Sequence, residues 1–551
     1  MRRHIFITLP ALALCLFHLS SIATARAVNS ATSTPSATFS DRTQALGLNQ
    51  PTRVFEADVA WVDYDQDGNV DLLVGDRLYR NLGPTQGYRF EDVSDAVGLG
   101  ALRDFGAFGD INGDGLVDLV CRNGQLFIQG PSGHFEDHFA DSGLQGKWHP
   151  FTITVQLVDF DGDGLVDILT GMVEKPEADG NSTLFPPQAF KNIGNGHFVD
   201  VSEQLGLSNL PQYTRSIAVS DYNHDGVLDY YYSNYRLMPN QLFSLENGQF
   251  VDRAKEKGVQ KEFQTHTYNF PVLENGSVTN KEFKGPWYGH SIGSTWADFD
   301  NDGNLDLWVS NLAHKGVTQT DQRGVWCDDS KFYRNTGAPD YHFVDMRSNS
   351  GIPILPVGPR GEELWSHITA ADFNGDGFID AFVPQIYNLA ISKAHLFENH
   401  GGWKFTETTE QSGITIFGTY AGAWADYDND GYADLITVGK AFAGATSDTV
   451  HLYHNDLSNK APANYVRLDL KSRHPLEGTL VRLKLTDGQT LTRQVEGTTG
   501  AYNQQNDPRI LINVPLGKTV KSMLIDWSWG FSQEFAAKEI RMNQAWKIQK
   551  D

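Results

Sequence analysis

Short apolar runs recur along the chain, with a polar turn between successive runs. Val59-Ala60-Trp61-Val62 precedes such a turn and Leu72-Leu73-Val74 follows it. Further along, Leu307-Trp308-Val309 occupies the same place after another turn. Runs this short, rich in β-branched and aromatic residues and bounded by Gly, Asp and Asn, are typical of strands rather than helices. The pattern predicts an all-β protein.

The turn between two such runs follows a nine-residue pattern, Asp-x-(Asp/Asn)-x-Asp-Gly-x-x-Asp, that occurs seven times. Self-similarity at a period of roughly 40 to 80 residues is typical of propellers and solenoids. We number these acidic loops one to seven along the chain. They span residues 63–71, 110–118, 159–167, 221–229, 298–306, 372–380 and 426–434.

Two further signatures recur between the acidic loops. One is an apolar-aromatic pair ending near Asn, as in Leu78-Tyr79-Arg80-Asn81, and the other is Phe-x-Asp with a later Gly-apolar pair, as in Phe90-Glu91-Asp92. Each repeat thus holds four short strands, the content of one propeller blade. The seventh repeat lacks Phe-x-Asp, but Phe39-Ser40-Asp41 precedes the first acidic loop. We predict a seven-bladed β-propeller over residues 36–457, closed by its N-terminal strand.

The spacing of the acidic residues favours a bound cation. In a tight turn the side chains at positions 1, 3, 5 and 9 converge, the carbonyl of position 7 joins them, and Gly at position 6 permits a positive φ. Hard oxygen ligands suit Ca²⁺ better than zinc or copper. The alternative is a set of Asp-Gly turns with solvated carboxylates. Seven copies that share Gly and the last Asp favour the metal, with up to seven Ca²⁺ ions.

The loops resemble the calcium-binding loops of FG-GAP or VCBS repeats, as in the integrin α-subunit propeller. The longer phrase, acidic loop, then Leu-Tyr-x-Asn, then Phe-x-Asp with Gly-Leu, is similar to the cartilage acidic protein family and its bacterial relatives. The resemblance covers 36–457 and implies that positions 1, 3, 5 and 9 bind Ca²⁺ through side chains and position 7 through its carbonyl. The implied ligands are Asp63, Asp65, Asp67, Asn69, Asp71, Asp110, Asn112, Asp114, Leu116, Asp118, Asp159, Asp161, Asp163, Leu165, Asp167, Asp221, Asn223, Asp225, Val227, Asp229, Asp298, Asp300, Asp302, Asn304, Asp306, Asp372, Asn374, Asp376, Phe378, Asp380, Asp426, Asp428, Asp430, Tyr432 and Asp434.

After residue 462 the repeat stops and a small β domain is predicted over 463–551. Tyr465 to Leu470 alternates as a half-buried strand does, and Val481–Leu485, the turn Asp487-Gly488 and Thr490–Val495 indicate a hairpin. The domain resembles the ASPIC and UnbV domain of cartilage acidic protein relatives. The matching residues are Gly478, Val481, Arg493, Gly497, Gly500, Tyr502, Gln504, Leu516-Gly517, Asp526-Trp527 and Gly530. Val514-Pro515 and Ser528-Trp529 depart from the phrases usual in that family.

The first 27 residues have the form of a secretory signal peptide. Arg2 and Arg3 precede an apolar stretch from Ile5 to Ile22, and small residues around Ala25 and Ala27 offer a cleavage site. A membrane anchor is the alternative, but His18 and the serines after it break the apolar run early. We expect a secreted or periplasmic protein, and no later run is long enough to span a bilayer.

The charge balance narrows the choice of partners. Lys and Arg number 44 against 68 Asp and Glu, a formal net charge of −24. This excess argues against nucleic acid and anionic membrane surfaces, and it favours calcium. A protein, glycan or small-molecule ligand stays open.

Six polar residues stand shortly before six of the acidic loops, where the first strand of each blade begins. These are Asp58, Asp104, Arg215, His290, His367 and Tyr420. A common offset would place them around one cavity at the channel mouth, where Arg215 would anchor an anion and a histidine would transfer a proton. Each could instead be an ordinary strand-end hydrogen bonder. Long aromatic insertions at 282–288, 322–327 and 361–365 could add recognition surface.

Two functions remain on this evidence. The first is a calcium-binding propeller that recognises a protein, glycan or other ligand at the channel mouth. The second is a propeller enzyme of a biosynthetic pathway, of an alkylation or cyclisation type, with its site at the same mouth. The sequence contains no G-x-S-x-G, H-E-x-x-H or Cys/His nucleophile pattern, which disfavours ordinary hydrolase chemistry.

Overall fold

The fold comes from a computed structural model of the chain. It describes residues 36–48, 58–176, 182–260, 266–274, 277–285, 288–313, 328–354, 363–387, 392–500 and 502–550, with the backbone alone for 266–285. Residues 35–551 cluster as one compact unit. The predicted signal peptide lies outside the described residues.

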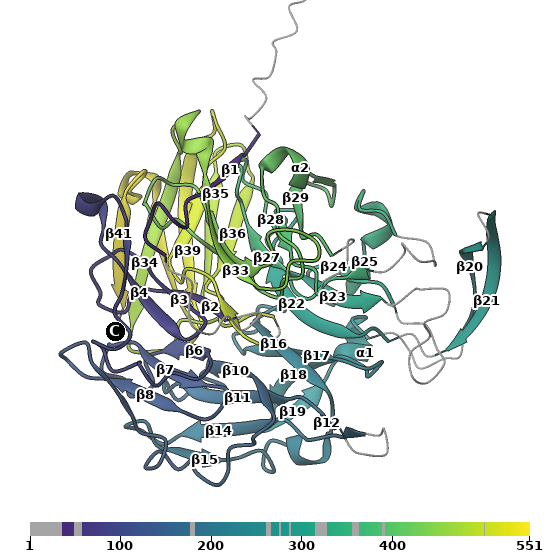
Figure 1. The fold of residues 1–551 in the computed structure, drawn as a ribbon, viewed down its shortest axis with the longest axis horizontal. Coiled ribbons are helices and arrows are strands. Elements are labelled where there is room, and N and C mark those ends of the chain that lie inside the picture. The colour runs from purple at the N-terminus through teal and green to yellow at the C-terminus, as the bar shows by residue number, and fades with distance from the viewer. Residues whose placement is uncertain are drawn as a thin grey trace, which may run out of the picture. The chain divides into compact units, whose positions relative to one another are not determined.

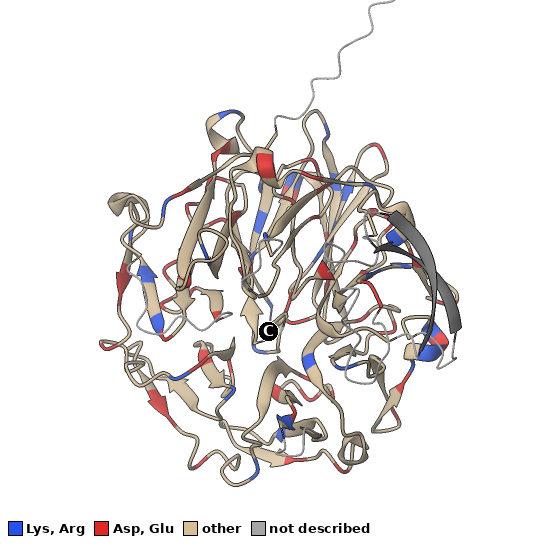
Figure 2. Cartoon of the chain, turned by 45° about the vertical axis from the view of Figure 1, so that its right-hand side comes forward, with Lys and Arg blue, Asp and Glu red and all other residues tan. Residues whose placement is uncertain are grey.

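The described part of the chain is mostly β, and its repeat region contains seven sheets built on four antiparallel strands each, consistent with propeller blades (Figure 1). Each acidic loop joins the first and second strands of one sheet. Figure 2 shows acidic residues recurring around the whole described ribbon, as this repetition requires.

The strands follow the chain order within each sheet, apart from the last sheet, whose fourth strand is β1. In order the sheets are β2 (Val59–Val62), β3 (Asp71–Val74), β4 (Arg77–Asn81), β5 (Phe90–Asp92); β6 (Gly106–Gly109), β7 (Asp118–Cys121), β8 (Leu126–Gln129), β9 (Phe135–Asp137); β10 (Thr152–Val158), β11 (Asp167–Met172), β14 (Gln188–Asn192), β15 (Phe198–Asp200); β16 (Thr214–Ser220), β17 (Asp229–Asn234), β18 (Gln241–Glu246), β19 (Gln249–Asp252); β22 (Ser291–Ala297), β23 (Asp306–Ala313), β24 (Lys331–Asn335), β25 (Phe343–Asp345); β27 (Thr369–Ala371), β28 (Asp380–Val383), β29 (His395–Asn399), β30 (Phe405–Glu407); and β31 (Ala423–Ala425), β32 (Asp434–Gly439), β33 (Thr449–Asn455), β1 (Phe39–Asp41).

Smaller elements fill the connections. They are two hairpins, β12 (Lys175–Pro176) with β13 (Ser182–Thr183) and β20 (His266–Glu274) with β21 (Ser277–Gly285), the strand β26 (Glu363–Leu364) on β23, the short helices α1 (Ala254–Lys257) and α2 (Thr409–Ser412), and 3₁₀ turns at Pro84–Gln86, Leu207–Asn209, Arg347–Asn349, Asp456–Asn459 and Ala537–Glu539.

The predicted closure by the N-terminal strand is confirmed. Strand β1 pairs antiparallel with β33, with Phe39 opposite Asn455 and Asp41 opposite Tyr453 (Figure 1). Phe39 is buried beside Phe373 and Trp424. The first and last parts of the repeat region therefore share one sheet, in which β1 covers the edge that β33 would otherwise expose.

Neighbouring sheets are held together by buried side chains and by the recurring Gly-apolar pair. Buried clusters join every sheet to the next, including the last to the first. At the outer edge, the residue before Gly98 accepts a hydrogen bond from the Phe135 N–H of the next sheet. Gly98 has φ 89°, and a Cβ there would lie 2.4 Å from the Phe135 carbonyl oxygen. Glycine is thus required at this position both by its positive φ and by the close approach of the Phe135 carbonyl.

The C-terminal unit forms two further sheets around a separate core. They are β38 (Ile510–Asn513), β34 (Tyr465–Ser472), β41 (Ala545–Lys550), and β36 (Thr490–Gln494), β35 (Leu480–Leu485), β39 (Val520–Trp527), β40 (Phe531–Ala536). Their inner faces share the buried residues Val466, Leu483 and Met523. The predicted hairpin is confirmed as β35 and β36.

This unit lies on the acidic-loop end of the repeat sheets. Arg467 Nη1 is 3.2 Å from Asp426 Oδ2, and Arg493 Nη2 is 3.6 Å from Asp372 Oδ2. Asn513 Nδ2 donates to the Gly431 carbonyl at 2.8 Å. Loops six and seven of the repeat region are therefore partly covered by basic and amide side chains of the C-terminal unit.

Between β36 and β38 the chain leaves the C-terminal unit and runs among the first strands of the repeat sheets. Thr499 and Gln504 exchange backbone hydrogen bonds and form a hairpin tip, and β37 (Gln504–Gln505) pairs parallel with β2. Asn503 bonds to the backbone of Val155, and Asn506 to that of Trp424. We call residues 496–507 the central segment, because it contacts first strands of several sheets.

Candidate functional site

All seven acidic loops share one backbone conformation. The Gly at position 6 has φ between 83° and 92° in every loop, as the sequence predicted. Position 4 is also left-handed in every loop, which the sequence pattern did not indicate. Its occupants are Gln66, Gly113, Gly162, His224, Asn301, Gly375 and Asn429. Gly and Asn are the residues that adopt this region most easily. The residue type at position 4 therefore helps to determine the conformation of the loop.

The first and last aspartates anchor each loop. The position 1 carboxylate accepts the N–H of the position 6 glycine in all seven loops, at 2.8 Å from Gly115 to Asp110 and 3.1 Å from Gly431 to Asp426. The position 9 carboxylate accepts the N–H of position 2, as between Phe160 and Asp167 at 3.1 Å.

The recurring Asn at the end of the third strand joins neighbouring loops. In the third sheet the Asn192 N–H donates to Asp167 Oδ1, and its amide donates to the carbonyls of Val166 and Ile111. Ile111 belongs to the loop of the preceding sheet. Asn81, Asn335, Asn399 and Asn455 make the same contacts, and Gln129 substitutes in the second sheet. The signature thus sets the spacing of the acidic loops.

The donor set of the loops fits a hard cation. Side-chain oxygens of three aspartates lie within 4.8 Å of one another in loops one, three, five and seven. Several of these oxygens are buried without a hydrogen-bond donor, namely Asp63 Oδ1, Asp300 Oδ1, Asp426 Oδ1 and Asp428 Oδ1. Buried carboxylate oxygens are ordinarily paired. A Ca²⁺ ion at the centre of each loop would satisfy them, and only oxygen ligands are needed.

Burial raises the pKa of the aspartates at positions 1 and 9 of the loops, and neighbouring carboxylates raise it further. The pKa of Asp118 rises to about 7 and that of Asp167 to about 8. Burial likewise raises the pKa of Asp298 to about 7 and that of Asp221 to about 6. Holding these groups ionised without a cation is therefore unfavourable near neutral pH.

The apo protein should lose stability as the pH rises from about 5 to 8. A carboxyl whose pKa is raised in the folded state stabilises the fold below its unfolded pKa of 3.8, and that stabilisation is lost as the pH rises through 6 to 8. Bound Ca²⁺ favours the ionised form, so the difference in Tm between calcium-loaded and chelated protein should widen over this range. Thermal melts in both states at several pH values measure it. A constant difference would contradict the expectation.

The structure places four of the six predicted mouth residues in two groups. In the first, Arg122 Nη2 is 3.0 Å from Asp58 Oδ1, and both side chains are buried. Asp104 accepts the N–H of Asn123 and adds its charge to this pair. Burial raises the pKa of Asp58 to about 7 against the opposing pull of Arg122. Arg122 also donates to the carbonyl of Tyr502 and lies over its ring.

The second group surrounds Tyr235. Arg215 pairs with Glu174 at 2.6 Å and lies over the Tyr235 ring at 4.7 Å. The His290 ring is 4.7 Å from that of Tyr235. His290 Nδ1 accepts the N–H of Arg236, whose own guanidinium reaches Glu174 at 3.0 Å.

Tyr502, at the tip of the central segment, connects the two groups. Its ring is 5.3 Å from that of Tyr420. Tyr235, Tyr420 and Tyr502 all pack on one buried cluster formed by Ile292, Leu312, Leu364 and Ile386. We call this assembly the tyrosine cluster. Sequence reasoning named Tyr502 only as a residue that matches the ASPIC and UnbV domain. It missed Arg122 and Glu174, because their partners are distant in the chain and no short motif marks them.

His367 is placed differently from His290. It is fully buried, and its Nε2 is 3.3 Å from Thr499 Oγ1 of the central segment. Burial lowers the pKa of His367 to about 3, so it is neutral at physiological pH. Its surroundings suit packing against the segment, and His290 is buried as well, at 5% exposure. Of the aromatic insertions, side chains 282–287, residues 322–327 and residues 361–362 lie outside the described residues.

Comparison with known proteins agrees with the loop geometry. The FG-GAP-like repeat family matches residues 110–170 and 159–232, and the ASPIC and UnbV family matches residues 470–551. The chain carries FG-GAP-like repeats and a C-terminal ASPIC/UnbV domain. It is also distantly similar to cartilage acidic protein 1, at 28% identity over 205 residues for the Xenopus tropicalis protein and 26% over 212 residues for the human one.

These alignments are partial. Each covers 37% of this chain and about a quarter of the relative, 26% for Xenopus and 25% for human. Among solved structures, the V. cholerae biofilm matrix protein Bap1 matches with a TM-score of 0.34 and 12% identity over 76% of this chain and 91% of that one. A Bacillus licheniformis rhamnogalacturonan lyase matches with a TM-score of 0.27 and 12% identity over 72% and 71%. Scores this low carry no argument about function.

Within the described ranges, none of the helices has the length and apolar composition that a membrane crossing needs.

Proposed function

We propose that this chain is a secreted or periplasmic calcium-binding protein. Its seven repeat sheets form a seven-bladed β-propeller, its C-terminal unit inserts the central segment into the channel, and it binds a protein or glycan at the channel mouth. The observation that carries the proposal is the repeated loop geometry. Carboxylate oxygens converge in loops one, three, five and seven, and loops one, five and seven contain buried carboxylate oxygens without a hydrogen-bond donor.

The FG-GAP-like match supports the calcium part of the proposal. Each loop offers carboxylate oxygens from positions 1, 5 and 9. Position 3 supplies a further carboxylate in loops one, three, five and seven and an amide oxygen, from Asn112, Asn223 or Asn374, in loops two, four and six. When bound, Ca²⁺ would neutralise these groups and fix the loop. The ion would be structural, because the loops connect the first two strands of each sheet.

The tyrosine cluster supports the ligand-binding part. Tyrosine and arginine are enriched where proteins recognise ligands, because they offer large apolar area together with hydrogen-bonding groups. Here Arg215 and Arg236 share Glu174, which fixes their positions. The hairpin tip, with Tyr502, would close the channel from within, so the mouth would be a shallow cup rather than a tunnel.

Replacing His290 tests the mouth. The calcium-loaded protein is screened on an array of glycans and secreted proteins, and bound members are titrated with the parent and with His290→Gln. Gln keeps an acceptor for the Arg236 N–H, so we expect an unchanged fold and a loss of affinity of at least about tenfold. Lys521→Ala, on an exposed position of β39, is the matched control.

Two results would change the proposal. Parental affinity in His290→Gln would remove His290 from the site. Turnover of an array member, abolished in the variant, would favour the enzyme alternative over the binding protein.

A further inference from the structure

In all seven acidic loops, a nitrogen of a neighbouring side chain contacts the same carboxylate oxygen. It is Oδ2 of the position 5 aspartate, and a side-chain donor reaches it in each loop. In loops two, four and six that donor is the position 3 asparagine. The Nδ2 to Oδ2 distances are 3.0 Å from Asn112 to Asp114, 2.9 Å from Asn223 to Asp225 and 3.2 Å from Asn374 to Asp376.

The other four loops have Asp at position 3 and take their donor from the third strand of the sheet. Arg334 Nη2 is 2.9 Å from Asp302 Oδ2, and its Nε is 2.6 Å from Asp300 Oδ2 at position 3. Lys191 contacts Asp161 and Asp163, and Arg80 contacts Asp65 and Asp67. In each case one cationic side chain bridges positions 3 and 5.

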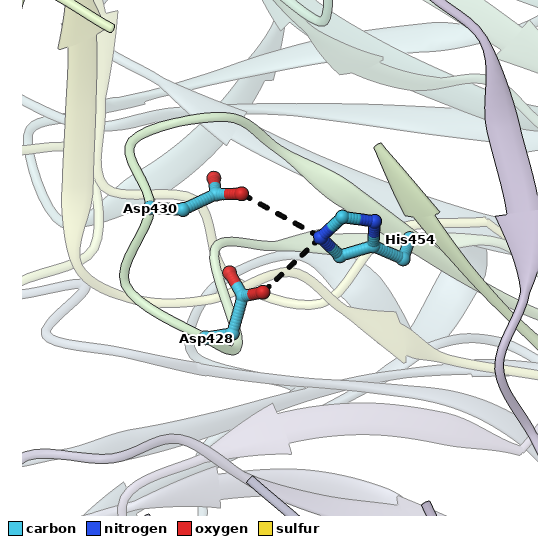
Figure 3. Close-up of side chains that lie close together, drawn as sticks. All are labelled: Asp428, Asp430 and His454. Atoms are coloured by element: carbon cyan, nitrogen blue, oxygen red, sulfur yellow. Dashed lines mark ion pairs between the residues drawn. The ribbon is translucent and has the colours of Figure 1, made fainter. Parts of the chain in front are cut away.

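His454 has the same place in the seventh loop. Figure 3 shows the Asp428 and Asp430 carboxylates directed at one nitrogen of its ring. The distances from Nε2 are 3.2 Å and 3.5 Å. The imidazole approaches from strand β33, whereas both aspartates belong to the loop between β31 and β32.

Strand register shows that these four residues are equivalent. Arg80, Lys191, Arg334 and His454 each precede the residue that pairs with the Phe of the fourth strand. In loops with Asn at position 3 the same site holds Ile128, Ser244 and Glu398. A basic residue therefore occurs where position 3 is Asp and is absent where position 3 is Asn.

Because of this correlation, loops with Asp at position 3 and loops with Asn at position 3 have similar net charges. Loops one, three and five carry four carboxylates and one permanent cation, and loops two and four carry three carboxylates and a neutral residue at the equivalent site. The formal charge offered to a cation is the same in both types. Loop six differs, because Glu398 adds a carboxylate. There Arg493 of the C-terminal unit approaches Asp372.

We propose that Arg80, Lys191 and Arg334 are built-in counter-cations that set the calcium affinity of the loops with four carboxylates. The inference rests on the proposed calcium binding and goes beyond it, since it assigns a role to residues that are not ligands. The cation holds the outer Oδ2 atoms of positions 3 and 5, and in loop five Oδ1 of Asp300 is buried without a hydrogen-bond donor and is free to bind the metal. Without it, the extra carboxylate would strengthen calcium binding and destabilise the apo loop.

Loop five allows a direct test, because Trp403 Nε1 donates to Asp300 Oδ2 at 3.2 Å and can report on occupation of the loop. Intrinsic fluorescence of the full chain is titrated with Ca²⁺, and the part that is lost in Trp403→Phe is assigned to loop five. Three variants form a cycle: Arg334→Gln, Asp300→Asn and the double variant, which converts loop five to the type of loop two.

The expected results have opposite signs. Removing one positive charge about 5 Å from a divalent ion should lower the half-saturating Ca²⁺ concentration roughly tenfold in Arg334→Gln, and Asp300→Asn should raise it by a similar factor. The double variant should return to within about threefold of the parent. A second readout needs no calcium: in chelator, Arg334→Gln should melt below the parent, and Asp300→Asn should restore the Tm.

The failures of the two proposals are distinguishable. If equilibrium dialysis finds no calcium on the parent chain, the proposed calcium binding is overturned. If the parent binds calcium but Arg334→Gln has parental or weaker affinity, or the double variant is as weak as Asp300→Asn, the counter-cation role is overturned and Arg334 only packs against the loop.

Discussion

Removal of calcium is expected to lower the Tm of this protein by about 3–10 °C. Ca²⁺ sites in extracellular modules have dissociation constants of about 10⁻⁴ to 10⁻³ M. At about 1 mM Ca²⁺ each site then adds about 0.4–1.4 kcal/mol to the free energy of unfolding, and seven sites add about 3–10 kcal/mol. For a chain of this length roughly 1 kcal/mol corresponds to 1 °C. Scanning calorimetry with and without EDTA measures the shift.

The control is restoration by different ions. Ca²⁺ should restore the Tm, whereas Mg²⁺ should restore less, because it requires a more regular octahedral shell and gives up its water reluctantly. Identical melting curves after thorough chelation would contradict a structural role for calcium.

Loss of strand β1 is expected to have a comparably large effect. Phe39 is buried in the core between the sixth and seventh sheets, while Leu46 and Leu48 lie in the core between the seventh and first. Deleting residues 36–48 would remove these contacts and expose the edge of β33. We expect aggregation or a fall in Tm of more than about 5 °C, measured by light scattering during thermal melts.

A chain that begins at Ser36 keeps strand β1 and is the matched control. It should have the same Tm as the parent protein. Phe39→Ala is the milder variant, expected to cost about 3–5 kcal/mol because it leaves a large cavity in a packed core. If the chain lacking 36–48 stays monomeric with the parental Tm, β1 does not close the repeat region.

Much of the fold could be predicted because the information is local and repeated. The nine-residue loop and the positive φ of its Gly depend on residues adjacent in the chain. The displaced Phe39-Ser40-Asp41 phrase predicted the pairing of β1 with β33, because only one missing strand and one spare strand were present. The hairpin β35–β36 followed from its turn residues.

The candidate site could be predicted from the sequence only in part. The loop aspartates could be named from spacing, but their anchoring by Asn192 and its equivalents involves a loop in the preceding sheet. For the mouth, the common offset predicted that Arg215, His290 and Tyr420 lie near one another, and all three are found at the tyrosine cluster. The same offset did not distinguish His367 from these three residues, although His367 is buried against the central segment instead.

The sequence by itself determined the repeat, the acidic loops and the order of strands, because each depends on residue types at short, regular spacings. Only the tertiary structure decided that residues 496–507 of the C-terminal unit run among the first strands, and that Arg80, Lys191, Arg334 and His454 stand over their loops. The contacts of residues 496–507 join positions several hundred residues apart, and no local pattern encodes such a distance. The contacts of the four basic residues span 13 to 34 residues, and charge pairing selects them only once the strands and the loop of each sheet are folded together.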